Sequence, residues 1–166
     1  MTRRHLMLVA AAIGLILVGG LGWWLASPLF LNQQVDDAFP FEPSSETEAT
    51  TADGWLIAAQ GAFMDGDSLH LGSGSATIFQ QGEQRVLRFE EFSVTNGPDL
   101  HVMLSTNPAP TGQSDIGGDH IDLGPLKGNQ GDQNYPIPDE LDLSDYQSVV
   151  IYCVPFHVVF ATATIR

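Results

Sequence analysis

The sequence predicts an all-β domain, an antiparallel β-sandwich or barrel, preceded by one N-terminal transmembrane helix. Two observations support this fold class. Residues 6–25 contain no charged side chain. From Trp55 onward, short apolar runs alternate with glycine-rich and polar turns, and no long helical period is present. We therefore expect a transmembrane anchor over residues 1–31, an acidic flexible linker over residues 32–54 and an extracytoplasmic β domain over residues 55–166.

The apolar block over residues 6–25 is long enough to cross a bilayer. A helix of 20 residues is about 30 Å long, which matches the hydrocarbon core of a membrane. Arg3 and Arg4 precede the block and acidic residues begin at Asp36, so we expect a cytoplasmic N-terminus in a single-pass protein of the cell membrane. A cleaved signal peptide is the alternative. We favour an uncleaved anchor, because cleavage after Ala26 would place Trp24 where a small residue is preferred.

The segment over residues 32–54 is rich in Asp, Glu, Pro, Ser and Thr. Such a composition buries too little apolar surface to offset its ordering entropy, so it predicts a flexible spacer. Docking of Phe39 and Phe41 on the domain is the alternative.

The chain after the apolar block is strongly acidic. It carries four basic residues against all 20 acidic ones, a formal charge of −16. A surface of this kind repels nucleic acid and anionic lipid, which excludes a phosphate-backbone partner.

Six strands are expected in the β domain, and turns follow from Gly82 and from the Asn96–Asp99 stretch. Prolines and glycines over residues 106–143 leave little room for regular strands, so we expect a long functional loop or a packed cap there. A single helical turn is expected over residues 142–145. The expected strands cover residues 56–63, 70–79, 85–94, 100–104, 148–153 and 158–165.

Cys153 is the only cysteine in the chain. Outside the cytoplasm it has no internal disulfide partner, so three fates are open: a buried inert thiol, a redox or intermolecular thiol, or a ligand to a metal or prosthetic group. Its neighbours are apolar, and burial among them would raise the pKa of the thiol and suppress its nucleophilicity.

Cys153, Pro155 and His157 stand in the order found in the copper loop of cupredoxins. Residues four apart on a continuous strand are about 13 Å apart, so Pro155 must turn the chain for both ligands to meet one metal. A second histidine is also needed. Our candidate copper set is Cys153, His157 and His101, with His70 and His120 as other possible ligands. The sequence contains no hydrolase motif and no phosphate-binding loop.

Several stretches resemble the DM-thirteen domain, over about residues 55–165. They are the Asn-Gly-Pro-Asp-Leu run at 96–100, the Leu-Lys-Gly-Asn-Gln-Gly-Asp-Gln-Asn-Tyr run at 126–135, and the segment with the single cysteine. The residues of this family motif are Asn96, Gly97, Pro98, Asp99, Leu100, Lys127, Gly128, Asn129, Gly131, Asp132, Gln133, Asn134 and Tyr135.

The resemblance implies a β-rich fold and an electron-transfer role through Cys153, as a free thiol or as a ligand to a prosthetic group such as haem. It also implies a membrane-anchored protein of the bacterial kind. The sequence lacks the Cys-x-x-Cys-His run of covalent c-type haem. From the residues themselves, we expect Tyr135 to fill part of the core and Lys127 to pair with Asp132 as a solvated ion pair.

We therefore expect an accessory redox module, rather than a catalyst with its own substrate, that works with a redox protein partner. The cofactor is unknown, haem and copper being the candidates. A cell-surface binding or adhesion module, with Cys153 as core packing and residues 106–143 as the recognition surface, is the first alternative. A cupredoxin-like copper carrier is the second.

Overall fold

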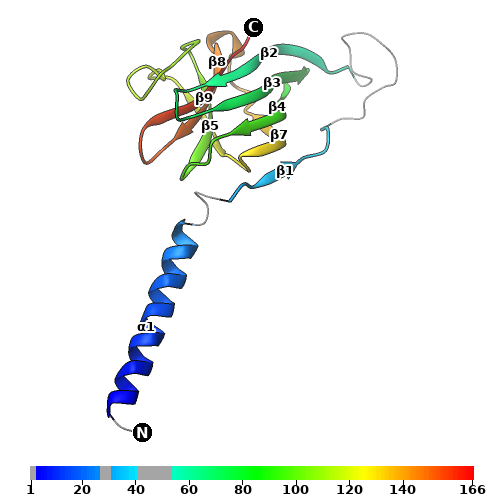
Figure 1. The fold of residues 1–166 in the computed structure, drawn as a ribbon. Coiled ribbons are helices and arrows are strands. Elements are labelled where there is room, and N and C mark those ends of the chain that lie inside the picture. Colours follow the sequence, from blue (N-terminus) through cyan, green and yellow to red (C-terminus); the bar gives the residue numbers. More distant parts are fainter. Residues whose placement is uncertain (1–2, 27–30, 41–53) are drawn as a thin grey trace. The chain divides into compact units, whose positions relative to one another are not determined.

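The computed structural model describes residues 3–26, 31–40 and 54–166, in two compact units, Met1–Leu31 and Asn32–Arg166. The first unit holds a helix and the second holds a β-sheet (Figure 1). In chain order the elements are α1 (Arg3–Ala26), β1 (Gln34–Asp36), β2 (Leu56–Asp65), β3 (Gly72–Gln81), β4 (Gln84–Val94), β5 (Leu100–Ser105), β6 (Ile121–Pro125), β7 (Gln130–Ile137), the 3₁₀ turn η2 (Leu143–Asp145), β8 (Ser148–Cys153) and β9 (Val158–Thr164).

Helix α1 contains the apolar block of the sequence. By length and composition, its Arg3–Trp23 stretch is able to cross a membrane, and N-terminal signal sequences have the same property. A straight apolar helix forms here because residues 6–25 contain neither proline nor a charged side chain.

The β unit is one curled, nine-stranded sheet in the order β1-β7-β4-β3-β2-β9-β8-β5-β6. Neighbouring strands are antiparallel, except that β1 pairs with β7 in parallel. Figure 1 shows β2, β3, β4 and β7 side by side. The predicted antiparallel all-β fold is thus confirmed, as a half-barrel rather than two stacked sheets.

The main core lies inside the curl of the sheet. The ring of Phe63 packs edge-on against Phe89 and Phe92, with centroids 4.9 and 5.0 Å apart. Val149 and Ile151 on β8 belong to the same cluster. Because the sheet is curled, its two halves face each other and bury their apolar side chains in one core.

Strand β8 is buried on both faces because a loop covers its outer side. Ile116 in that loop packs on Met103, Val150 and Tyr152. The loop is held down by Ser105, whose hydroxyl donates to the carbonyl of Ile116 at 2.5 Å. Residues 106–120 thus form a packed cap, one of the two outcomes expected for this region.

The rest of that region differs from the expected loop, because residues 121–125 and 130–137 form β6 and β7. Proline is tolerated in β7 because β1 pairs only with residues 130–132, which leaves the far part of β7 at the edge of the sheet. Pro136 lies in this edge part, opposite Val86 of β4.

The first part of the expected spacer also differs, because residues 34–36 form β1 against β7. Phe39 docks as the alternative proposed: its ring lies edge-on to Phe79 at 5.4 Å, and the guanidinium of Arg88 lies 4.8 Å from its centroid. Phe41 lies outside the described residues. The buried Arg88 needs hydrogen-bond acceptors, and the carbonyl of Asp37 in this acidic segment is one of them. Because Arg88 is distant in sequence, the composition of the segment does not reveal this interaction.

Gly131→Ala tests this docking. Gly131 has a φ of +94°, and a Cβ there would collide with the carbonyl oxygen of Val35. We expect the change to lower the free energy of unfolding by about 2–3 kcal/mol. It should also speed hydrogen exchange at the amide of Asp37, which donates to the Asp132 carbonyl.

Gly82→Ala is the matched control, because Gly82 also has a positive φ, +59°, but a Cβ there meets nothing within 4 Å. It should cost only about 1 kcal/mol, from backbone strain. Equal costs for the two variants, with Asp37 exchange unchanged in Gly131→Ala, would contradict the docking.

Candidate functional site

Cys153 ends β8 with its side chain fully buried. Its thiol donates a hydrogen bond to the carbonyl of Pro98 at 3.1 Å. Burial raises the pKa of the thiol above its usual value; the backbone amide of Phe156, hydrogen-bonded to the sulfur, opposes this shift, and the charge of Asp99 adds to it. Cys153 is therefore held as a neutral thiol.

The first family motif, residues 96–100, closes over this thiol. Leu100 pairs with Cys153 across β5 and β8, and the amide of Val154 donates to the carbonyl of Asp99 at 3.2 Å. Gly97 lies so close to the ring of Phe160 that a Cβ would be 2.6 Å from it. The sequence predicts only a turn at residues 96–99. In the structure the same stretch also encloses the thiol of Cys153.

The histidines expected beside Cys153 lie elsewhere. Successive side chains of a strand point to opposite faces, so Tyr152 and Cys153 face away from each other. His101 pairs with Tyr152 and shares its face, and the Nδ1 of His157 lies 3.2 Å from the Tyr152 hydroxyl. The structure therefore brings His101 and His157 to the outer face of the sheet and leaves Cys153 on the inner face.

Each histidine of the sheet unit has another polar neighbour. His101 lies 2.7 Å from Asp122 and 3.4 Å from Asp99. The Nδ1 of His70 lies 2.8 Å from Asp67, and that of His120 lies 2.7 Å from the carbonyl of Gly117.

The surroundings of Cys153 do not fit copper or haem. Within residues 3–26, 31–40 and 54–166, no three His, Cys, Asp or Glu side chains are grouped so that they could hold a metal ion. The sulfur of Cys153 is buried and already hydrogen-bonded, and neither His101 nor His157 shares its face. A second ligand or a haem face would need the surrounding strands to separate.

The second family motif, residues 127–135, holds the segment before the domain. Asn129 accepts from the amide of Gln33 at 2.7 Å, and the amide of Asn134 donates to Asp37 at 3.0 Å. A Cβ on Gly128 would collide with the carbonyl of Gln33. The motif is therefore a cradle, built of side-chain amides and glycines, for residues 32–39.

The charges of this cradle differ from the ion pair expected. The ammonium of Lys127 pairs with Asp37 at 2.5 Å rather than with Asp132. Asp132 instead pairs with the buried Arg88 at 2.8 Å, and Glu90 lies 3.1 Å from the same guanidinium. Hydrogen bonding to Lys127 is the main cause that lowers the pKa of Asp37. Sequence reasoning missed Arg88, whose one signal was a cation two residues before Glu90 in an acidic domain.

Tyr135 fills the core beneath the cradle, as predicted. Its hydroxyl donates to Gln133 at 2.7 Å and accepts from the amide of Lys127 at 3.0 Å. Burial raises the pKa of Tyr135 far above its usual range. Gln133 in turn donates to the carbonyl of Gly128 at 2.8 Å, so the hydrogen-bonding groups of the motif are mutually satisfied.

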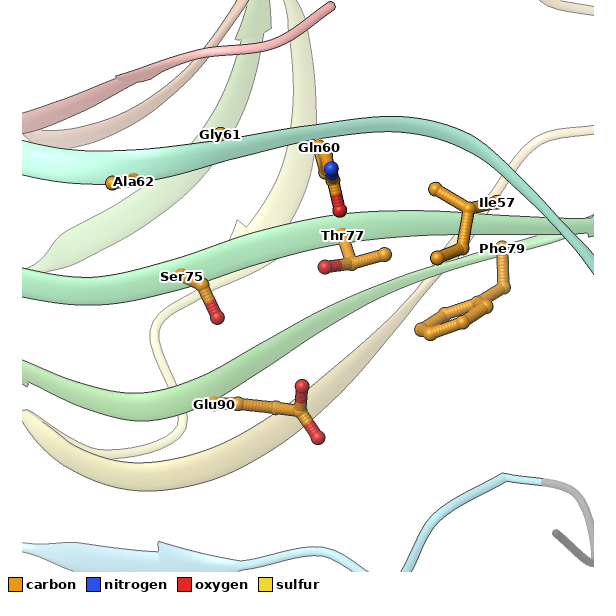
Figure 2. A pocket seen from close by; sticks show the side chains of 8 residues that line it. All are labelled: Ile57, Gln60, Gly61, Ala62, Ser75, Thr77, Phe79 and Glu90. Atoms are coloured by element: carbon orange, nitrogen blue, oxygen red, sulfur yellow. The ribbon is translucent and has the colours of Figure 1, made fainter. Parts of the chain in front are cut away.

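A separate hollow lies over β2, β3 and β4, as Figure 2 shows. Small residues such as Gly61 and Ser75 form part of its lining, Ile57 and Phe79 lie together, and Glu90 projects from β4. Glu90 is its one titratable lining residue, and that carboxylate already contacts Arg88. A single carboxylate is too few ligands for a metal site, so this hollow does not offer one.

Comparison with known proteins gives one finding. The family model described as Electron transfer DM13 matches residues 63–165, which include the thiol, its enclosure and the cradle but not the segment that the cradle holds. No curated protein and no solved structure matches the chain. Because the match covers more than half of its length, this chain belongs to the electron transfer DM13 family.

Proposed function

We propose that this chain is a membrane-anchored, extracytoplasmic electron-transfer module whose redox-active group is the thiol of Cys153. The observation that carries the proposal is that one of the two family motifs, residues 96–100, encloses the only cysteine of the chain. The description of the family as electron transfer supports the same role.

Burial of the thiol would slow its oxidation. Oxidation of a thiol begins from the thiolate, and burial disfavours the thiolate of Cys153. The four-residue turn between β8 and β9 directly follows Cys153, and its Phe156 is 68% exposed. Opening of that turn would admit a partner without dismantling the sheet.

The anchor determines where such a partner would be found. Helix α1 begins with Arg3 and Arg4, ahead of its apolar block, which favours a cytoplasmic N-terminus and an extracytoplasmic sheet unit. The domain would then exchange electrons with a redox protein of the same membrane surface. We propose that it acts as an accessory to that protein, without a substrate of its own.

A cell-surface binding module is the second candidate. The observation that favours it is the position of Cys153 within the main apolar core, alongside Val149 and Ile151. A buried thiol of raised pKa is the usual state of a cysteine that only packs. In that case the cap over residues 106–120 would present the recognition surface.

Reaction with oxidised glutathione separates the two candidates. The Cys153 thiolate attacks one glutathione sulfur, a mixed disulfide forms and reduced glutathione leaves. In the full chain we expect Pro155→Gly to raise the rate of this reaction about tenfold, because a glycine loosens the turn over the thiol. Mass spectrometry follows the reaction, and Cys153→Ser gives the blank.

Gly131→Ala is the matched control, since it destabilises the domain far along the sheet from the turn. It should leave the rate within about twofold of the unmodified chain, because local opening does not depend on global stability. Acceleration as large as that of Pro155→Gly would show that Cys153 reacts only after global unfolding, and the binding module would replace the redox proposal.

The raised pKa of Cys153 also predicts a pH dependence of stability. In the unfolded chain the thiol loses its proton from about pH 8.5, whereas the folded chain retains it to higher pH. The unfolded state then binds fewer protons, so the free energy of unfolding falls as pH rises, by at most about 1.4 kcal/mol per unit.

Urea unfolding between pH 7.5 and 9.5, a range about the usual thiol pKa, measures this slope. Cys153→Ser should remove the part of the decline that begins near the usual thiol pKa. Equal slopes in the two proteins would mean that the thiol ionises as easily in the folded chain as in the unfolded one.

A further inference from the structure

A pocket lies on the outer face of the sheet, on the side away from the Cys153 thiol. It lies between the cap, which contributes residues 113, 114 and 116–118, and the outer side of β5 and β8, which contribute Met103 and Tyr152. Its volume is about 500 Å³, within the range of sites that hold small molecules. None of the family motif residues lines it.

The floor of this pocket is apolar and partly aromatic. Met103 and Ile116 are each 4% exposed, and Tyr152 is 5% exposed. The three side chains pack in one cluster, with Val154 against them. A thioether beside a phenol ring is a favourable surface for a flat aromatic ligand, because sulfur and ring faces both attract aromatic rings.

The rim offers hydrogen-bond acceptors. The Nδ1 of His120 lies 2.7 Å from the carbonyl of Gly117, and a carbonyl only accepts, so Nδ1 carries the proton. In the neutral ring Nε2 is then a bare acceptor. Asp122 is a second acceptor, oriented by His101 at 2.7 Å and by the amide of Gly124 at 2.8 Å.

The charge of the pocket is unfavourable for anions. Neither lysine nor arginine lines it. The cations of the strands and loops contact other groups: Arg88 pairs with Asp132, Lys127 pairs with Asp37, and Arg85 donates to the carbonyl of Leu141. An anionic ligand would therefore meet the carboxylate of Asp122 with no lysine or arginine in the lining to offset it.

We propose that this pocket binds a small aromatic molecule that donates hydrogen bonds, a phenol or an aromatic amine. The ring packs on Met103 and Tyr152, and its hydroxyl or amino group donates to His120 or Asp122. This site lies on the opposite face from the Cys153 thiol, so it does not depend on the redox role proposed for Cys153.

Methyl NMR spectra of the full chain in detergent micelles test the proposal. Phenol and aniline serve as the two donor probes, benzoate as the anion and cyclohexanol as the non-aromatic alcohol. A bound ring shifts the methyl signals of Met103 and Ile116, with a dissociation constant of about 1 mM for so small a ligand. Met64, 70% exposed on β2, reports non-specific partition and should not shift.

Binding by phenol alone, aniline alone or both supports the proposal and identifies the donor. Benzoate should not bind, and cyclohexanol should bind at least about fivefold more weakly than phenol. Shifts at Met64 equal to those at Met103, or equal affinity for benzoate, would overturn the proposal.

Two substitutions at exposed positions locate the site. Ser114→Trp fills the pocket and should abolish the shifts, whereas His120→Ala should weaken binding about fivefold through loss of one hydrogen bond. His70→Ala is the matched control, because His70 also has its Nδ1 beside an oxygen, that of Asp67, but lies outside the pocket. Unchanged affinity in Ser114→Trp would overturn the assignment.

Discussion

The hydrogen bond from the buried thiol of Cys153 to the carbonyl of Pro98 is the constraint on which the proposed site depends. A polar group that is removed from water needs a partner, and at the end of β8 the 96–99 loop supplies it. The same loop accepts from the amide of Val154, so loop and turn close together. This enclosure thus keeps the thiol protonated, limits the access of other molecules to it and fixes the register of β5 against β8.

The second constraint is electrostatic and acts at the other end of the sheet. Arg88 is buried in a domain that is otherwise acidic, and it is compensated by Asp132, by Glu90 and by the carbonyl of Asp37. Removal of one partner from such a group would leave an uncompensated buried charge. This explains why an acidic segment outside the family match is bound on the sheet, and why the 127–135 motif is rich in side-chain amides.

Much of the fold could be predicted because its central strands are apolar runs that can be recognised in the sequence. The apolar run at 148–153 matches β8 residue for residue, and the helix follows from uninterrupted apolar sequence. Strands β1, β6 and β7 gave no such signal, because distant partners such as Arg88 hold their polar residues in place. The position of His157 on the opposite face from Cys153 was equally hidden, since it depends on the turn after β8 rather than on spacing.

The most direct test of the central claim is the redox state of Cys153 in the cell that makes the protein. Acid quenching followed by maleimide labelling in denaturant measures the fraction of free thiol before, during and after exposure to an oxidant. The account predicts that the labelled fraction falls on oxidation and recovers within minutes after the oxidant is removed. Complete labelling at every stage, in a chain that remains folded, would contradict it and leave Cys153 as a packing residue.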